Sequence, residues 1–326
     1  MKLRIGSRGS PLARWQAEWV KAKLAAAGHE AEISFIRTTG DREPSAALTG
    51  SGVKGLFIKE IEEALLAGRV DLAVHSMKDL PTALPDGLTV GAVPEREDPR
   101  DVLVVGAGLP LDFARGPEPV EGKPATTPSQ GALAGLPQGA RVGTSSLRRQ
   151  SQLRALRPDL AIAPMRGNVD TRLRKLDEGV CDGVVLAAAG LKRLGFEGRI
   201  SQYFAVEELC PAVGQGALAI EVRTGDRHVT EAIRRLEHFA THFAVTAERA
   251  ALAALGGGCD LPFAANARIE GGCLTLRGVV AALDGSKVIR AECSAPAGDP
   301  ESLGARLALD LEKQGARELL ASMSPD

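Results

Sequence analysis

The stretch RIGSRGS, residues 4–10, decides the fold class of this chain. A strand-like alternation leads into glycines and hydroxyl residues, and Ser10-Pro11 then opens a helix that runs to Gly28. Serine at the N-cap, proline at the first helical position and glycine just past the end form a consistent set of start and stop signals. A strand that leads directly into a helix in this way is typical of an α/β domain with a mostly parallel sheet.

The same order of elements recurs further along the chain. RVGTSS at residues 141–146 again places a glycine and hydroxyl residues between a strand and a helix. GVCDGVV at 179–185 likewise resembles GRVDLAV at 68–74. We therefore predict two similarly built α/β domains that face each other, an arrangement whose clefts bind small ligands.

Three domains are expected. Domain 1 is predicted to be discontinuous, over residues 1–96 and 212–235, whereas domain 2 spans 100–210 and domain 3 spans 238–326. Within domain 2, residues 106–140 are rich in glycine, proline, alanine and threonine. This composition predicts a flexible surface insertion and not a folded element.

Domain 3 is predicted to be a small α+β unit. Its strand-like segments break at Gly271-Gly272 and at Asp284-Gly285, a strong hairpin signal, and a last helix is expected from about Pro300 to Ser322. Cys259 follows the glycine run of residues 256–258. Because those neighbours lack side chains, a bulky group could approach the sulfur, so Cys259 is the candidate attachment point or nucleophile.

The composition narrows the class of function. The chain has 326 residues, a net charge of -1 and a hydrophobic fraction of 44%, values typical of a globular protein that does not bind nucleic acid. It contains no apolar run of membrane-spanning length. Five cysteines without C-x-x-C spacing favour a reducing cytoplasm and no metal site. Aromatic residues make up only 3%, so we expect a ligand to be recognised by charge.

One candidate site is VHSMKDLP at residues 74–81. A buried strand would deliver Ser76, Lys78 and Asp79 to the carboxyl end of a parallel sheet, where α/β ligand sites form. A carboxylate there can accept ligand hydrogen bonds, stabilise a developing cation or transfer protons. The alternative is a helix-capping Asp79 beside a solvated lysine. His75 is interpreted as a packed core residue.

A second site is GTSSLRRQ at residues 143–150. A helix N-terminus offers free N–H groups and a positive dipole end. Arg148 and Arg149 in the first turn oppose that dipole, which is unfavourable unless a ligand anion lies between them; guanidinium groups bind carboxylates bidentately. A solvated basic face is the alternative, and it suits Arg154 and Arg157 better.

Further arginines stand near helix starts. Arg166 precedes a helix that Asn168 would cap, Arg172 lies inside it, and Arg8 and Ser10 stand at the first helix. A cleft lined in this way favours a ligand with many carboxylates. PAVGQGAL at 211–218 is interpreted as a hinge whose backbone approaches the ligand at Gly214 or Gly216.

Six segments of the chain resemble the porphobilinogen deaminase family, in the right order and nearly end to end. They are VHSMKDLP at 74–81, PEREDPRD at 94–101, GTSSLRRQ at 143–150, RGNVDTRL at 166–173, PAVGQGAL at 211–218 and GGGCDLP at 256–262. The resemblance implies two domains like those of periplasmic binding proteins and a third that carries a cofactor loop.

The resemblance also implies a reaction. Four porphobilinogen molecules would be joined head to tail with release of ammonia, and hydrolysis would free linear hydroxymethylbilane. A dipyrromethane primer would be held on Cys259 by a thioether. Asp79 would contact pyrrole nitrogens and stabilise the azafulvene cation. The protein would be a cytoplasmic, monomeric transferase of porphyrin and heme biosynthesis.

Each pyrrole carries an acetate and a propionate, so the growing chain would be a polyanion held by basic and hydroxyl residues. Besides Cys259 and Asp79, the residues expected to contact the primer are Ser76, Lys78, Thr144, Ser145, Ser146, Arg148, Arg149, Arg172 and Gly216. Those expected to contact substrate are Arg8, Ser10, Arg166 and Arg172.

Two other functions are considered. A non-catalytic carboxylate-binding protein could use the same two-domain cleft, but it would not need a glycine-flanked cysteine on a third domain. A cysteine hydrolase would need a histidine partner for Cys259, and neither His238 nor His242 is indicated as one.

Overall fold

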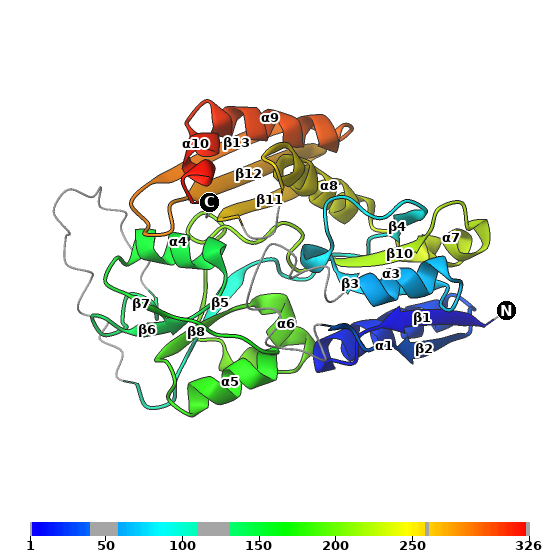
Figure 1. The fold of residues 1–326 in the computed structure, drawn as a ribbon, viewed down its shortest axis with the longest axis horizontal. Helices are drawn as coiled ribbons and strands as arrows, with labels where there is room; N and C mark the ends of the chain where they lie inside the picture. Colours follow the sequence, from blue (N-terminus) through cyan, green and yellow to red (C-terminus); the bar gives the residue numbers. More distant parts are fainter. Residues whose placement is uncertain (1, 40–57, 110–130, 258–260, 324–326) are drawn as a thin grey trace.

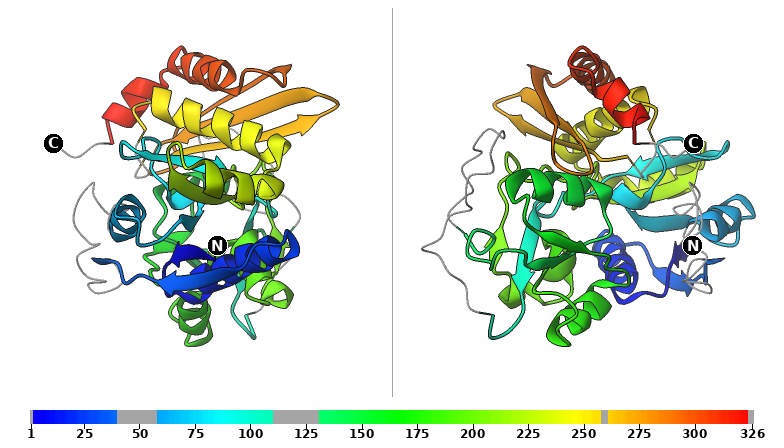
Figure 2. Two further views of the ribbon diagram at one scale, coloured as in Figure 1. Left: turned by 90° about the vertical axis from the view of Figure 1, so that its right-hand side faces the viewer. Right: turned by 60° about the vertical axis from the view of Figure 1, so that its left-hand side comes forward.

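A computed structural model of the chain describes residues 2–39, 58–109, 131–257 and 261–323 (Figure 1). The described residues form three sheets, each with its own helices, and we name the three parts domains 1, 2 and 3 by these sheets. Domains 1 and 2 lie side by side, and domain 3 covers one end of both (Figures 1 and 2). The predicted α/β class with a smaller α+β domain is confirmed.

Domain 1 is built on a five-stranded sheet of order β2-β1-β3-β10-β4. β1 runs parallel to β2 and β3, whereas β10 is antiparallel to β3 and β4. Because β10 comes after domain 2 in the chain, domain 1 is discontinuous. The strands are β1 (Leu3–Ser7), β2 (Ala31–Phe35), β3 (Leu72–Ser76), β4 (Leu88–Ala92) and β10 (Leu218–Arg223). The helices are α1 (Pro11–Ala26), α3 (Lys59–Leu66), α7 (Arg227–Ile233) and the 3-10 turns η3 (Met77–Asp79) and η5 (Arg234–Leu236).

Domain 2 repeats this sheet, with the order β7-β6-β8-β5-β9. Again three strands are parallel, and the fourth, β5, is antiparallel to β8 and arrives from the other domain. The strands are β5 (Asp101–Val105), β6 (Arg141–Gly143), β7 (Ala161–Ala163), β8 (Gly183–Ala187) and β9 (Gln202–Tyr203). The helices are α4 (Leu147–Leu156), α5 (Val169–Asp177), α6 (Ala188–Arg193) and the 3-10 turn η4 (Glu197–Arg199).

Domain 3 packs helices on one face of an antiparallel sheet of order β11-β12-β13. The strands are β11 (Phe263–Glu270), β12 (Cys273–Ala281) and β13 (Val288–Pro296). The helices are α8 (Phe239–Ala254), α9 (Pro300–Glu312) and α10 (Ala316–Ala321). Its core joins α8 and α9 to the sheet through residues such as Ala247, Leu276 and Leu307, each 0% exposed.

Two expectations are corrected. The last helix is not continuous from Pro300 to Ser322, because Gly315 adopts a left-handed φ of 89° and separates α9 from α10. The insertion at 106–140 is not wholly a loose surface segment. Leu133 and Leu136 are 2% and 4% exposed and belong to the core of domain 2, so apolar burial has fixed its described end. Residues 110–130 lie outside the described part.

The start signals of the helices are confirmed where the structure describes them. The Ser10 hydroxyl accepts a hydrogen bond from the Ala13 amide at 3.4 Å, and Pro11 is the first residue of α1. Asn168 occupies the N-cap position of α5, although its side chain makes no capping bond. Both hairpins of domain 3 fall at the predicted glycines.

Candidate active site

The end of β3 delivers the proposed acid to the junction of the domains. The strand is buried up to His75, and η3 then carries Lys78, half-buried, and Asp79, exposed. The Ser76 hydroxyl accepts a hydrogen bond from Gln16 of α1 at 2.8 Å. Asp79 lies inside the 3-10 turn, whose N-cap is Ser76, so it is not a capping residue. The residue is therefore exposed at the surface beyond β3.

His75 is a packed residue, as expected. It is 6% exposed, and its Nε2 atom lies 3.0 Å from the carboxylate of the fully buried Glu221 on β10. The pair joins two adjacent strands beneath the site and does not reach its surface.

Domain 2 contributes the start of α4, held by its own hydroxyl residues. Ser146 is the N-cap and accepts a bond from the Arg149 amide, while the Thr144 hydroxyl accepts from the Ser146 amide at 3.2 Å. The Ser145 hydroxyl accepts from the Met165 amide at 2.9 Å. These contacts fix the helix start, where the N–H groups and dipole favour an anion.

Arg148 and Arg149 are buried, each 5% exposed, and form ion pairs with the two oxygens of one carboxylate. The Arg148 guanidinium donates to one oxygen of Asp101 at 2.6 Å, and Arg149 donates to the other at 2.7 and 3.1 Å. The anion predicted between the two arginines is thus the side chain of Asp101, which is 0% exposed. The expectation of a ligand anion at that point is corrected.

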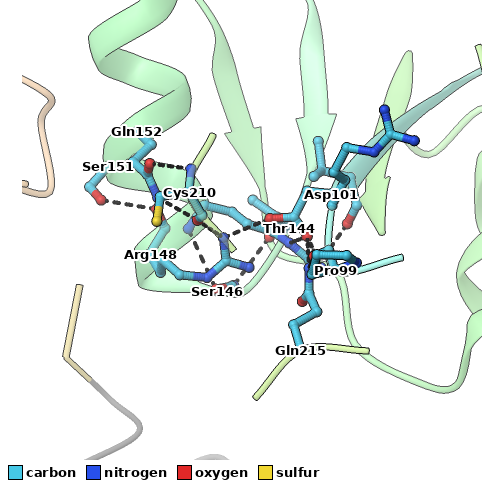
Figure 3. Close-up of polar contacts among 12 residues, drawn as sticks. Pro99, Asp101, Thr144, Ser146, Arg148, Ser151, Gln152, Cys210 and Gln215 are labelled. Carbon is cyan, nitrogen blue, oxygen red and sulfur yellow. Dashed lines mark hydrogen bonds and ion pairs between the residues drawn. The ribbon is translucent and has the colours of Figure 1, made fainter. Parts of the chain in front are cut away.

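Two glutamines complete this network (Figure 3). Gln215 donates to Asp101 at 2.9 Å and to the Pro99 carbonyl at 2.7 Å. Gln152 accepts from the Cys210 amide and, together with Arg148, donates to the Cys210 carbonyl. Burial alone would raise the pKa of Asp101, but the charges of Arg148 and Arg149 hold that pKa far below its usual range. Asp101 is therefore ionised and fully compensated.

Sequence reasoning missed Asp101. It opens the apolar strand Asp101–Val105 within the quoted segment PEREDPRD, and a charge at the head of a buried strand requires a partner. The choice of partner depends on β5 entering the sheet beside β8, which the local sequence does not indicate.

The cations of both domains share one electrostatic environment. Burial lowers the pKa of Lys78 to about 8; Asp79 opposes this, and Arg149 adds to it. Burial lowers the pKa of Arg172 to about 10, with Arg149 and Arg166 adding to the effect and Asp79 opposing it. These groups therefore lie close enough to interact electrostatically across the domain junction. Their charges are costly in the free protein, and anions placed among them would relieve that cost.

The remaining predicted residues surround this cluster at helix starts. Arg8 is half-buried directly after β1, and Ser10 is used as the N-cap of α1. Arg166 is exposed before α5. Among the described residues, Arg172 of α5 donates through Nε alone, to the Gly167 carbonyl at 2.8 Å, so its terminal nitrogens can bind a ligand.

Gly214 and Gly216 make their close approaches to the protein itself. A Cβ on Gly216 would lie 2.3 Å from the Glu97 carbonyl oxygen, and its φ is 87°. A Cβ on Gly214 would lie 2.5 Å from Met77. The glycines therefore let the two crossovers between domains pack together, against each other and against η3.

Two arginines that sequence reasoning missed hold this hinge. Arg96 donates to the buried Glu248 of α8 at 2.6 and 3.2 Å and to the Gln215 carbonyl at 2.7 Å. Arg193 of α6 donates to the Gly216 carbonyl at 2.7 Å and lies over the ring of Trp15 on α1. Domain 3 and domain 2 are thereby tied to the crossovers.

Arg154 and Arg157 do not form a solvated face, which corrects that interpretation. Arg157 is 3% exposed, pairs with Asp159 at 2.7 Å and donates to the Leu133 carbonyl at 2.8 Å, so it holds the folded end of the insertion. Arg154 donates to the Leu283 carbonyl of domain 3 at 3.0 Å.

A cavity of about 140 Å³ lies where the three domains meet. Lys78 and Arg148 contribute polar groups to it from domains 1 and 2. From domain 3 it is lined by Leu252, Leu261 and Phe263, which lie on either side of Cys259 in the sequence. Cys259 itself lies outside the described residues. The described residues on both sides of it nevertheless border the space next to Lys78.

Within the described ranges, no cluster of three histidine, cysteine or acidic residues could hold a metal ion. The helices of those same ranges include none with the length and apolarity required to cross a membrane.

Two domain models of one protein family match this chain, one over its N-terminal part and the other over its C-terminal part. The family described as porphobilinogen deaminase, dipyromethane cofactor binding domain, matches residues 3–231, and the porphobilinogen deaminase C-terminal domain matches residues 242–313. Porphobilinogen deaminase of Syntrophobacter fumaroxidans is 47% identical over 98% of this chain and 96% of that protein. Porphobilinogen deaminase of Desulforudis audaxviator is 50% identical over 97% and 96%.

Similar solved structures include a Salmonella typhimurium periplasmic binding protein, at 13% identity and a TM-score of 0.38 over 72% of this chain and 91% of that one. A lipoprotein from Enterococcus faecalis gives 12% identity and a TM-score of 0.39 over 72% and 90%.

Proposed function

The chain belongs to the porphobilinogen deaminase family, and on that premise we propose that it is a hydroxymethylbilane synthase. It joins four porphobilinogen molecules head to tail, releases ammonia at each addition and frees the linear product by hydrolysis. In reaction class this is a transferase of porphyrin and heme biosynthesis. The family model for residues 3–231 supports the cofactor, a dipyrromethane.

The observation that carries the proposal is the charge around Asp79. Seven charged side chains meet at the junction of domains 1 and 2. Five are cations, Lys78, Arg148, Arg149, Arg166 and Arg172, and two are acids, Asp79 and the compensated Asp101. This local excess of positive charge stands in a chain whose net charge is -1. It suits a ligand that carries two carboxylates on every ring.

The residues present suit the dipyrromethane cofactor. When bound, it supplies the pyrrole carbon to which each new unit is added. Cys259 would hold it through a thioether. The residues Leu252, Leu261 and Phe263, on either side of Cys259 in the sequence, border the junction cavity, which supports a cofactor position there. Lys78, Arg149 and Arg172 would bind its carboxylates, with Arg148 fixing Asp101 behind them, and Ser76, Thr144, Ser145 and Ser146 would complete the polar wall.

Asp79 is proposed to act on the reacting pyrrole. Its exposed carboxylate can accept a hydrogen bond from the ring N–H. As ammonia leaves, positive charge develops on the ring, and a fixed carboxylate beside it lowers the energy of that transition state. The surrounding cations hold the substrate carboxylates in place, a role that Arg8, Ser10 and Arg166 would share.

The hinge is proposed to let one site serve a growing chain. The crossovers meet at Gly216 and Glu97, and Arg193 binds the Gly216 carbonyl from domain 2. Rotation about these residues would open the junction as pyrroles accumulate. We further propose a cytoplasmic monomer without a nucleic-acid partner. The described cysteines, all unpaired, support a reducing compartment.

The proposal is tested by intact mass. Purified wild-type protein should carry the added mass of one dipyrromethane, Cys259→Ala should lack it, and Cys273→Ala, which alters another free thiol, should retain it. The wild type should also convert porphobilinogen with release of ammonia. An active wild-type protein without the adduct would contradict the assignment.

A further inference from the structure

Helix α8 of domain 3 turns one face toward the segment that follows Asp79. Val245, 1% exposed, belongs to an apolar cluster with Met77 and Leu80. Arg249 lies four residues further along, on the same helix face. Leu252, another turn on, borders the junction cavity beside Lys78. This face therefore runs along residues 77–82 and ends at the junction cavity.

Arg249 binds the backbone of residues 80–82, directly after the proposed catalytic acid Asp79. Its guanidinium donates to the carbonyls of three consecutive residues, Leu80 at 3.2 Å, Pro81 at 2.6 Å and Thr82 at 3.2 Å. These residues follow the η3 turn in irregular backbone, so their carbonyls have no sheet partners within the segment. One planar side chain from domain 3 thus fixes the path of the chain just beyond Asp79.

The neighbouring residue has a different task. Glu248 faces the hinge, where it accepts from Arg96 and from the Gly214 amide at 2.7 Å. Consecutive residues of α8 therefore hold the hinge and the Asp79 segment separately. α8 ends at Ala254, five residues before Cys259 in the sequence.

We propose that Arg249 is a positioning residue that sets Asp79 relative to the group held on Cys259. The inference rests on the proposed function, because it gives Arg249 a part in turnover and not only in folding. Asp79 belongs to domain 1 and Cys259 to domain 3, so their separation must be fixed by contacts between these domains. The contact of Arg249 with residues 80–82 joins these two domains directly after Asp79, and Arg249 lies on the helix that precedes Cys259 in the sequence.

The test compares two arginines that join domain 3 to another domain through backbone carbonyls. Arg249→Met removes the contact with domain 1, and Arg154→Met removes the contact of domain 2 with Leu283 of domain 3. A misplacement of about 1 Å can cost on the order of 100-fold in rate. Arg249→Met should therefore lower kcat by about 10- to 100-fold with KM almost unchanged, whereas Arg154→Met should keep kcat near the wild-type value.

Rates are normalised to the fraction of protein that carries the primer, measured by intact mass, and thermal unfolding is recorded for both variants. Arg249→Lys, whose amine can reach one carbonyl, should recover part of kcat and guards against failure of the methionine variant to fold. Equal loss of kcat in the Arg249 and Arg154 variants, a loss confined to KM, or full activity in both Arg249 variants would overturn the inference. Absence of porphobilinogen turnover in the wild type would instead refute the proposed function.

Discussion

Domains 1 and 2 share a sheet but differ at one matched position. In domain 1, β10 begins with Leu218 opposite Ser76, the last residue of β3. In domain 2, β5 begins with Asp101 opposite Ala187, the last residue of β8. The apolar and polar residues are thus exchanged between the two sheets.

The segments after β3 and β8 differ as well. β3 leads into η3 with Lys78 and the exposed Asp79, whereas β8 leads into α6, whose first residues, Ala188 and Ala189, are buried. Domain 1 places Asp79 after β3, and domain 2 places Asp101 at the start of β5. The acid of domain 1 is exposed, and that of domain 2 is buried beneath two arginines. The shared frame positions both, and burial decides which of them can take part in chemistry.

The largest expected effect is on the exposed acid. Asp79→Asn should lower kcat by about 1000-fold, within the range that a single positioned carboxylate contributes. It should leave the free energy of unfolding within about 0.5 kcal/mol of wild type, because the side chain is exposed. Single-turnover kinetics on primer-bearing protein and denaturant unfolding measure the two quantities.

The buried acid provides the opposite case. Asp101→Asn leaves Arg148 and Arg149 buried without a charge partner, so it should destabilise the protein by about 3–5 kcal/mol. If Asp79→Asn were the variant that lost stability, or kept full activity, the assignment of the two acids would have to be reversed.

The sequence allowed the frame to be predicted, because strand, glycine, hydroxyl and helix start follow one another locally in both domains. It also placed Asp79 just after the end of a buried strand, where the structure has it. The partner of Arg148 and Arg149 could not be predicted in this way. Asp101 lies 47 and 48 residues away in the chain and reaches them only through the order of strands.

Two further errors have the same origin. Residues 131–140 have a loop-like composition, yet Leu133 and Leu136 are buried by the domain 2 core and held by Arg157. The solvated interpretation of Arg157 failed for the same reason, because a long basic side chain was judged without its tertiary neighbours. Composition indicates local conformation, whereas burial depends on what packs against the segment.

The second largest effect is expected from changes to the arginines that pair with Asp101. Arg149→Leu should lower the free energy of unfolding by about 3 kcal/mol, because it removes two bonds to a buried carboxylate. It should also impair assembly of the primer, seen as a lower fraction of adduct by intact mass.

Arg172→Leu is the matched comparison for Arg149→Leu. Burial lowers the pKa of both arginines, but Arg149 is bonded to the buried carboxylate of Asp101, whereas Arg172 donates to the Gly167 carbonyl. Arg172→Leu should therefore reduce the free energy of unfolding by less than Arg149→Leu does. Loss of one charge-assisted contact of about 1.5–3 kcal/mol should raise KM by roughly 10- to 100-fold. Equal stability losses in the two variants would show that Asp101 does not depend on Arg149.

The smallest expected effect is the pH dependence that comes from Lys78. Both Asp79 and Asp101 raise the pKa of this lysine. With a pKa of about 8, Lys78 loses its charge as the pH rises through 8, so kcat/KM should fall by up to about tenfold per pH unit above that value. On the proposed function, bound ligand carboxylates should raise this pKa, and kcat should therefore fall only at higher pH. Lys78→Arg, which stays charged, should remove the decline.

Stability should change in the opposite direction over the same range. The pKa of Lys78 is lowered from 10.5 in the unfolded chain to about 8 in the folded protein. Between these values the unfolded state binds more protons, so the contribution of Lys78 to the free energy of unfolding rises with pH. Below pH 8 both states are protonated, and the charge of Lys78 lowers the stability of the folded protein. Lys78→Met should therefore raise the melting temperature at pH 7 and have little effect at pH 10.5, while it weakens substrate binding at pH 7. If Lys78→Met instead lost both stability and substrate binding at pH 7, the charge of Lys78 would stabilise the folded protein. Asp79 and Asp101 would then both be neutralised in part by Lys78, and the contrast between the exposed and the buried acid would be weaker.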